Sequence, residues 1–290
     1  MKKIAQNLIL AGIFLLGLSL MLYPSISNWW NSNHQSRAVA SYSEVVATMD
    51  QNNYEEKWQE ANAYNKRLAS LHKQSVFLSE ELEGEYNRML VVEDTDVMGY
   101  VEIPVIDCTL PMYHGTDEEE LQAGVGHLEW TSLPVGGEST HSVISGHRGV
   151  PSAKLLSNLD KVVVGDYFVI HVLNQSLTYQ VEKILIVEPD DVNDLYIEEG
   201  EDLCTLVTCT PYGINSHRLL IRGHRVDDNL VPELRIASDA TQIDPYLVAV
   251  VIGVFVLCIM LIFVFVSDRI RYGKVKKYTE PASTDNTKIP

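Results

Sequence analysis

A cysteine at the end of an apolar β-type run is the residue of this sequence best suited to covalent chemistry. Cys209 follows residues 205–208 and precedes a Thr-Pro-Tyr-Gly sequence typical of a turn, so its side chain is expected to be displayed rather than buried. Arg218 opens the next such run nine residues later, and its permanent charge suits an anionic sulfur or an oxyanion. A thiol beside a fixed cation predicts covalent acyl transfer.

Acyl transfer by a thiol also needs a base, because the nucleophile is the thiolate and a free cysteine has a pKa of about 8.5. His147 is the candidate base, since it ends another β-type run against glycine and is therefore aimed at a surface or a cleft. The alternative for His147 is a loop histidine with a structural hydrogen bond. Arg218 could instead pair with surface carboxylates, and Arg222, Arg225 and Arg148 compete with it for the oxyanion role.

The other cysteines are expected to have structural roles. Four cysteines in 290 residues are too few for a disulfide scaffold. Cys108 and Cys204 lie in apolar β-type runs, where a cysteine is most often a small buried hydrophobe, and a bridge between them stays open. Cys258 lies in a long apolar run, which leaves Cys209 as the cysteine followed directly by turn residues.

Two apolar segments predict two membrane spans. Residues 246–266 form an uncharged run without proline, which at about 1.5 Å per residue reaches about 30 Å, the thickness of a bilayer core. Residues 8–23 follow Lys2 and Lys3 without a convincing cleavage site, which favours a retained signal anchor. Basic residues also follow the second run, so both ends are expected in the cytoplasm and the segment between them outside the plasma membrane.

The outer segment is strongly acidic. The chain carries a net charge of −17, and its two tails hold eight Lys/Arg and three Asp/Glu, which leaves fourteen Lys/Arg and thirty-six Asp/Glu outside, a balance of −22. Such a surface repels nucleic acid and favours basic partners, for instance a protein that presents lysine. The alternative is that the acidity serves solubility alone.

The predicted secondary structure changes from helical to β near Met98. Before it, residues 42–88 are rich in helix formers and predict one or two helices on an extended arm. After it, short β-branched runs separated by turn signals predict an all-β barrel or sandwich. The expected strands cover residues 99–103, 108–113, 142–145, 167–172, 175–187, 203–208 and 218–224, with a short helix over 153–159.

At this point the sequence resembles a known family. The run from Thr205 to Cys209 with Arg218 resembles the TLxTC…R signature of sortases, the cysteine transpeptidases of Gram-positive cell surfaces. Further segments resemble the class C, pilus-assembling sortases in one order: YVEIP at 100–104, LPMYHGT at 110–116, GHLE at 126–129, TSLPVGG at 131–137, HSVISGHRG at 141–149 and CTPYG at 209–213. The resemblance is close over residues 98–226. It is weaker over the arrangement of the predicted membrane spans.

The resemblance implies a fold and a reaction. The fold would be the eight-stranded sortase β-barrel, mainly β with short helices, and it would occupy residues 98–236. Cys209 would be the nucleophile, His147 the general acid and base, and Arg218 the oxyanion and substrate stabiliser, while Thr208 would line the pocket of the sorting motif. The partners would be pilin subunits with LPxTG-like C-terminal signals, and neither a cofactor nor a metal is implied.

The flanking parts complete the predicted organisation. Residues 1–27 would hold the cytoplasmic N-terminus and signal anchor, 28–97 the extracellular helical arm or lid region, 237–245 a linker, 246–267 the C-terminal transmembrane helix, and 268–290 a basic cytoplasmic tail. Pilus-type sortases often carry a lid with an Asp-Pro-aromatic anchor, and no such tripeptide occurs around residues 72–86. Two hypotheses stay open: the arm has no lid, or Phe77 plugs the cleft by apolar contact alone.

Three alternatives to a pilin-polymerising transpeptidase remain. The first is a sortase that anchors surface proteins to peptidoglycan by the same chemistry. The second is a non-catalytic, membrane-tethered scaffold. The third is a papain-like cysteine hydrolase, which is disfavoured because Cys209 ends a β-type run rather than starting a helix.

Overall fold

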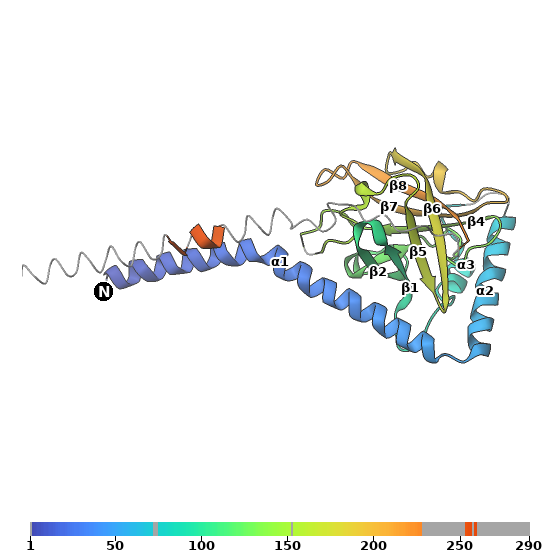
Figure 1. Ribbon diagram of the computed structural model, residues 1–290, viewed down its shortest axis with the longest axis horizontal. Coiled ribbons are helices and arrows are strands. Elements are labelled where there is room, and N and C mark those ends of the chain that lie inside the picture. The colour runs from blue at the N-terminus through green and yellow to red at the C-terminus, as the bar shows by residue number, and fades with distance from the viewer. Residues whose placement is uncertain (1, 72–74, 152, 228–252, 257, 260–290) are drawn as a thin grey trace, which may run out of the picture. The chain divides into compact units, whose positions relative to one another are not determined.

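The computed structural model describes residues 2–71, 75–151, 153–227, 253–256 and 258–259 (Figure 1). The chain divides into two compact units: residues Met1–Tyr23 with Ile243–Pro290, and residues Pro24–Gln242. The larger unit holds the β-barrel and the helical arm, and every site discussed below lies in it.

Eight strands form a closed barrel in the order β1-β2-β3-β4-β7-β8-β6-β5. Their bounds are β1 Val97–Ile103, β2 Cys108–His114, β3 Val125–His127, β4 Thr140–Gly146, β5 Tyr167–Val172, β6 Gln175–Val187, β7 Asp202–Thr210 and β8 His217–Arg225. The pairs β2–β3 and β4–β7 are parallel and the others antiparallel. The mainly β, eight-stranded fold expected from the sequence is therefore confirmed, and the seven expected strands are all present within it.

Two short elements differ from the expectations. The strand β3 has only three residues, too few to show an alternating pattern in the sequence. The helix expected over residues 153–159 is wrong: this segment forms turns and then a 3-10 turn, Leu159–Lys161. Leu155 has a φ of 37°, a backbone conformation incompatible with an α-helix. A short helix occurs instead before β3, as α4 (Glu118–Ala123).

Three helices precede the barrel: α1 (Lys2–Thr48), α2 (Gln51–Ser70) and α3 (Glu80–Tyr86). The helix α1 continues through Pro24, and its segment Gly12–Thr48 is long and apolar enough to cross a membrane by length and composition. The second span expected over residues 246–266 lies outside the described residues except for 253–256 and 258–259, which are helical.

The arm is fastened to the barrel by buried polar contacts. Figure 1 shows α2 and α3 along the same side of the barrel, and an ion pair between Arg67 and Glu85 joins the two helices. From α2, the Asn65 amide accepts from the backbone N–H of Leu133 at 2.7 Å and donates to its carbonyl at 2.9 Å. From α3, the Tyr86 hydroxyl contacts Nδ1 of His127 at 3.1 Å. Because these groups are buried, the arm is an integral part of the folded unit.

The apolar side chains form two clusters on opposite faces of the sheet. The large cluster fills the barrel and includes Cys204 and Leu206 of β7. The small cluster consists of Val143, Leu195, Val207 and Leu220. Since alternate residues of a strand point to opposite faces, β7 presents Val207 to the outside of the barrel and Leu206 to the inside. The crossover from β6 to β7 covers this outer face through Leu195 of the 3-10 turn Asn193–Leu195.

Candidate active site

Strand register brings the three predicted catalytic residues together. In the antiparallel pair β7–β8, Cys209 lies directly opposite Arg218. In the parallel pair β4–β7, Ser145 lies beside Val207, so two residues further on the chains reach His147 and Cys209. Residues up to 71 positions apart in the sequence, His147 and Arg218, thus meet with Cys209 at one end of β4, β7 and β8.

The alternation of each strand also sets the face on which these residues lie. Cys209 is two residues from Val207 and Arg218 is two residues from Leu220, so both share the outer face with the small apolar cluster. Cys209 itself is half-buried. A half-buried thiol at the edge of an apolar outer cluster is accessible to a peptide laid across that face.

Thr208 has a different environment from the one that the resemblance implies. It points inward, is 1% exposed, and its Oγ1 donates a hydrogen bond of 2.8 Å to the carbonyl of Gly146. The hydroxyl therefore ties the end of β7 to the end of β4 and leaves almost no surface for a peptide. The bond joins the residues that directly precede Cys209 and His147, while the pocket role that the resemblance implies for Thr208 stays a prediction.

The other two thiols of the barrel, Cys108 and Cys204, are not suited to act as nucleophiles. Cys108 and Cys204 are free cysteines, so the bridge left open by the sequence is absent from the structure. Burial raises the pKa of Cys108 to about 12 and that of Cys204 well above its ordinary value. At neutral pH both remain protonated and therefore poorly nucleophilic.

The arginines near the site differ in what they already bind. Arg222 is held by Glu182 at 2.8 Å and by Glu198 at 2.5 Å. Arg148, 8% exposed, pairs with Asp160 at 2.5 Å. Within the described part of the chain, no carboxylate lies within ion-pair distance of Arg218.

The hydrogen bonds of the Arg218 guanidinium to described residues go to backbone carbonyls, those of His217 at 3.2 Å and Asn215 at 3.5 Å. Arg225 is placed at the other end of β8, where its Nη1 donates to the carbonyl of Thr178 at 3.1 Å. Arg218 is thus the arginine that lies opposite the thiol and retains donors for a developing oxyanion.

His147 is held from two directions. Its carbonyl accepts a hydrogen bond from the backbone N–H of Leu156 at 3.2 Å. Its Nε2 lies 3.4 Å from Oε2 of Glu118, the first residue of α4. Sequence reasoning missed Glu118: three consecutive glutamates precede β3, and only the position of the six-residue helix decides which one faces the histidine.

Phe77 does not cover the site in this structure. It is 83% exposed, whereas a ring that plugged the cleft would be enclosed by the cleft walls. The exposed aromatic residue near the thiol is Tyr212, in the turn after β7, which is 62% exposed and lies 5.9 Å from the Arg148 guanidinium. The plug by Phe77 is therefore not the arrangement observed.

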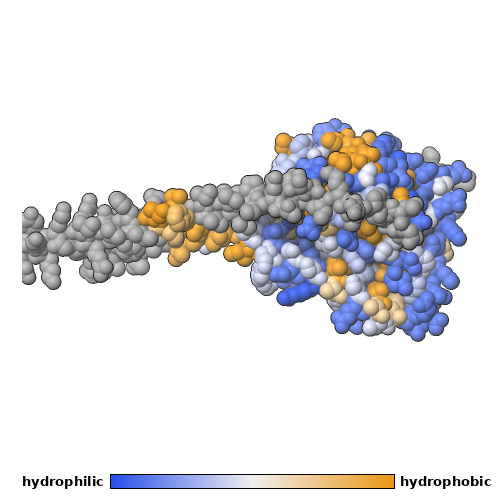
Figure 2. Space-filling view, in the orientation of Figure 1, coloured by the Kyte–Doolittle hydropathy of each residue, from blue (hydrophilic) through white to orange (hydrophobic). Residues whose placement is uncertain are grey.

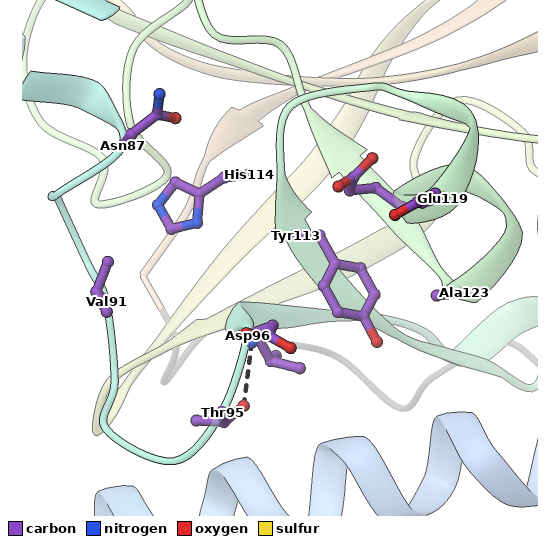
Figure 3. A pocket seen from close by; sticks show the side chains of 10 residues that line it. Asn87, Val91, Thr95, Asp96, Tyr113, His114, Glu119 and Ala123 are labelled. Carbon is purple, nitrogen blue, oxygen red and sulfur yellow. Dashed lines mark hydrogen bonds between the residues drawn. The ribbon is translucent and has the colours of Figure 1, made fainter. Parts of the chain in front are cut away.

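The barrel also has a cavity away from this site. It has a volume of about 450 Å³ and is lined by residues of the α3–β1 connection, β2 and α4 (Figure 3). Asp96, Tyr113, His114 and Glu119 are among the side chains around it, and Cys209, His147 and Arg218 are not. Among the described residues, no group of three or more His, Cys, Asp or Glu is arranged to hold a metal ion.

Comparison with known proteins agrees with this fold. The Sortase domain family matches residues 101–226. The structure of sortase C1 from Streptococcus agalactiae is 49% identical with a TM-score of 0.64, and the match covers 66% of this chain and 99% of that one. Sortase C from Streptococcus pneumoniae is 50% identical with a TM-score of 0.60, and the match covers 66% of this chain and 97% of that one.

Among curated proteins, Sortase D of Bacillus subtilis is 32% identical over 137 residues, which are 46% of this chain and 66% of that protein. The chain spans less than two thirds of the length of the curated relatives it matches, for example 47% of Sortase A from Streptococcus agalactiae. A closed barrel with a displayed cysteine facing an arginine is the architecture of a cysteine transpeptidase. The chain belongs to the sortase family, and its structural neighbours place it with the class C sortases.

Proposed function

We propose that this chain joins pilin subunits: it cleaves an LPxTG-like sorting signal between Thr and Gly and transfers the acyl group to a lysine of another pilin. The observation that carries the proposal is the strand register that sets Cys209 opposite Arg218 and beside His147 on one face of a sortase barrel. The proposed roles are nucleophile for Cys209, general acid and base for His147, and oxyanion stabiliser for Arg218.

The chemistry follows from these positions. The Cys209 thiolate attacks the Thr carbonyl, and the oxygen of the tetrahedral intermediate becomes anionic near the Arg218 guanidinium. His147 gives a proton to the departing glycine amine, which leaves a thioester on Cys209. A lysine ε-amine then attacks the thioester, its proton passes to His147, and the products are an isopeptide bond and the free thiol.

Two features favour a pilin over peptidoglycan as the acceptor. Streptococcus pneumoniae sortase C, 50% identical to this chain, has been described with respect to its pilin substrate specificity. The segment between the predicted spans has a balance of −22, and Figure 2 shows that the visible face of the barrel is mostly hydrophilic. An acidic surface attracts a protein that presents lysine.

The same proposal includes a location. The apolar segment of α1 and the run at residues 246–266 would span the plasma membrane, with the barrel outside and both ends in the cytoplasm. The test is an impermeant maleimide added to intact cells. The expected result is labelling of Cys209 and no labelling of a cysteine introduced at position 2 or 288; labelling of either introduced cysteine would contradict the two-span topology.

The direct test is polymerisation with the full-length chain in detergent. Mixed with a pilin that carries an LPxTG-like signal and surface lysines, it should give a ladder of covalent multimers, and the Cys209→Ala variant should give none. Hydrolysis alone, or transfer only to peptidoglycan-type amines, would favour the anchoring sortase. Unchanged surface assembly by Cys209→Ala in cells would favour the non-catalytic scaffold.

A further inference from the structure

The catalytic histidine has a carboxylate neighbour that the cysteine–histidine–arginine set does not include. Oε2 of Glu118 lies 3.4 Å from Nε2 of His147, and the His147 side chain is 27% exposed. Within the described residues, Glu118 is the only carboxylate within ion-pair distance of this ring. Nδ1, the other nitrogen of the ring, has no hydrogen bond to a described residue, so it remains for proton exchange.

Glu118 is itself held in place. Its Oε1 accepts a hydrogen bond of 2.8 Å from Nε2 of Gln122, one turn further along α4. The helix ends at Gly124, which packs so closely on β2 that a Cβ there would collide with the carbonyl oxygen of Pro111. The backbone of α4 is thus fixed against the barrel, and the glutamate is oriented by its own helix.

The other groups near His147 leave its orientation to this carboxylate. Arg218 of β8 and Cys209 of β7 lie opposite each other beside the end of β4. Arg148, the residue after the histidine, is held by Asp160 and Thr210 instead. Glu118 is therefore the described side chain placed to orient the His147 ring.

We propose that Glu118 is a positioning residue for His147: it binds Nε2 of the ring and leaves Nδ1 for proton exchange at Cys209. The proposal rests on the proposed function only for the role of His147. It adds a third group that orients the base and fixes its tautomer, as a carboxylate does for the histidine of other nucleophile–base pairs.

The carboxylate is suited to this role because it stays ionised. The hydrogen bond from Gln122, together with the positive charge of His147, lowers the pKa of Glu118 below its ordinary value. Glu118 is exposed, so its effect in the free enzyme is screened by water and is expected to be modest. A peptide laid over the site would exclude that water and strengthen the contact.

The test is NMR of the His147 ring in the full-length chain in detergent, without substrate. A Cys209→Ala background removes the coupled thiol, and loss of the signal in a His147→Asn variant assigns the ring. With Glu118 present, the neutral ring should carry its proton on Nε2, where the carboxylate accepts it. Glu118→Ala should remove that preference and give a mixture of the two tautomers.

Glu118→Gln separates the hydrogen bond from the charge, because its amide oxygen still accepts from Nε2–H, so this variant should keep the wild-type tautomer. Glu119→Gln is the matched control: it is the next residue of α4, lines the cavity in Figure 3, and should leave the tautomer unchanged. The proposal is overturned if Glu118→Ala leaves the tautomer unchanged, or if Glu119→Gln changes it equally. A wild-type chain that fails to join pilins would instead contradict the proposed function alone.

Discussion

At the scale of single residues, burial and ion pairs decide which cysteine and which arginine are available for the reaction. Cys209 is half-buried while Cys204 is fully buried, and Arg218 keeps its donors while Arg222 is held by two glutamates. The sequence indicated the cysteine and the histidine because both follow β-type runs and precede turn residues or glycine. It could not rank the arginines, since the ion pairs of Arg148 and Arg222 join residues 12 to 40 positions apart.

The first prediction concerns these arginines. Arg218→Gln should lower kcat for cleavage of a sorting-signal peptide by about 10²–10³, the usual loss when one oxyanion donor is removed. The measurement is steady-state cleavage of a fluorogenic peptide by the full-length chain.

Arg222→Gln serves as the control for the arginine prediction. It removes an equally charged residue four positions along β8, and it should leave kcat near that of the wild type while lowering the urea midpoint of unfolding, because two glutamates lose their partner. Equal losses of kcat in both variants would argue against a specific role for Arg218.

At the scale of elements, two short elements supply side chains that the long strands do not. The strands β4, β7 and β8 were predictable from apolar runs, whereas β3 and α4 have three and six residues and no periodic signal. Yet α4 supplies Glu118 to the histidine, and β3 supplies His127 to the arm. Such elements are formed by tertiary packing rather than by local propensity, which is why sequence patterns do not show them.

The second prediction concerns His127 of β3 and acid stability. Its ring is fully buried between the Tyr86 hydroxyl and the Ser132 carbonyl, and burial lowers its pKa to about 4. The unfolded chain, with a histidine pKa near 6.5, binds this proton first, so stability should fall as pH drops from about 6.5 to about 4. The contribution of this one group is at most roughly 3 kcal/mol.

Urea unfolding of the full-length chain, followed by tryptophan fluorescence at several pH values, measures this effect. His127→Gln keeps a donor for the Ser132 carbonyl but cannot titrate, so its stability should depend less steeply on pH between 6.5 and 4. The decline will not vanish, because burial also lowers the pKa of His114 and His141. An identical slope in the variant and the wild type would show that His127 does not contribute.

At the scale of the whole molecule, the arm and the barrel form one folded unit. Asn65 and Tyr86 reach the barrel from α2 and α3 through buried hydrogen bonds. Helix-forming composition predicted an arm, but it could not predict this docking, because the contacts depend on where two isolated polar side chains meet the barrel backbone. The barrel itself followed from a resemblance that extends over many short motifs in one order.

The account as a whole depends on Cys209 as the nucleophile. The most direct measurement is mass spectrometry of the full-length chain mixed with an LPxTG-like peptide and quenched in acid before turnover is complete. The expected adduct has the mass of the peptide fragment ending in Thr, maps to the segment that contains Cys209, is released by hydroxylamine as a thioester, and is absent from Cys209→Ala. An adduct on another residue, or undiminished cleavage by Cys209→Ala, would contradict the account.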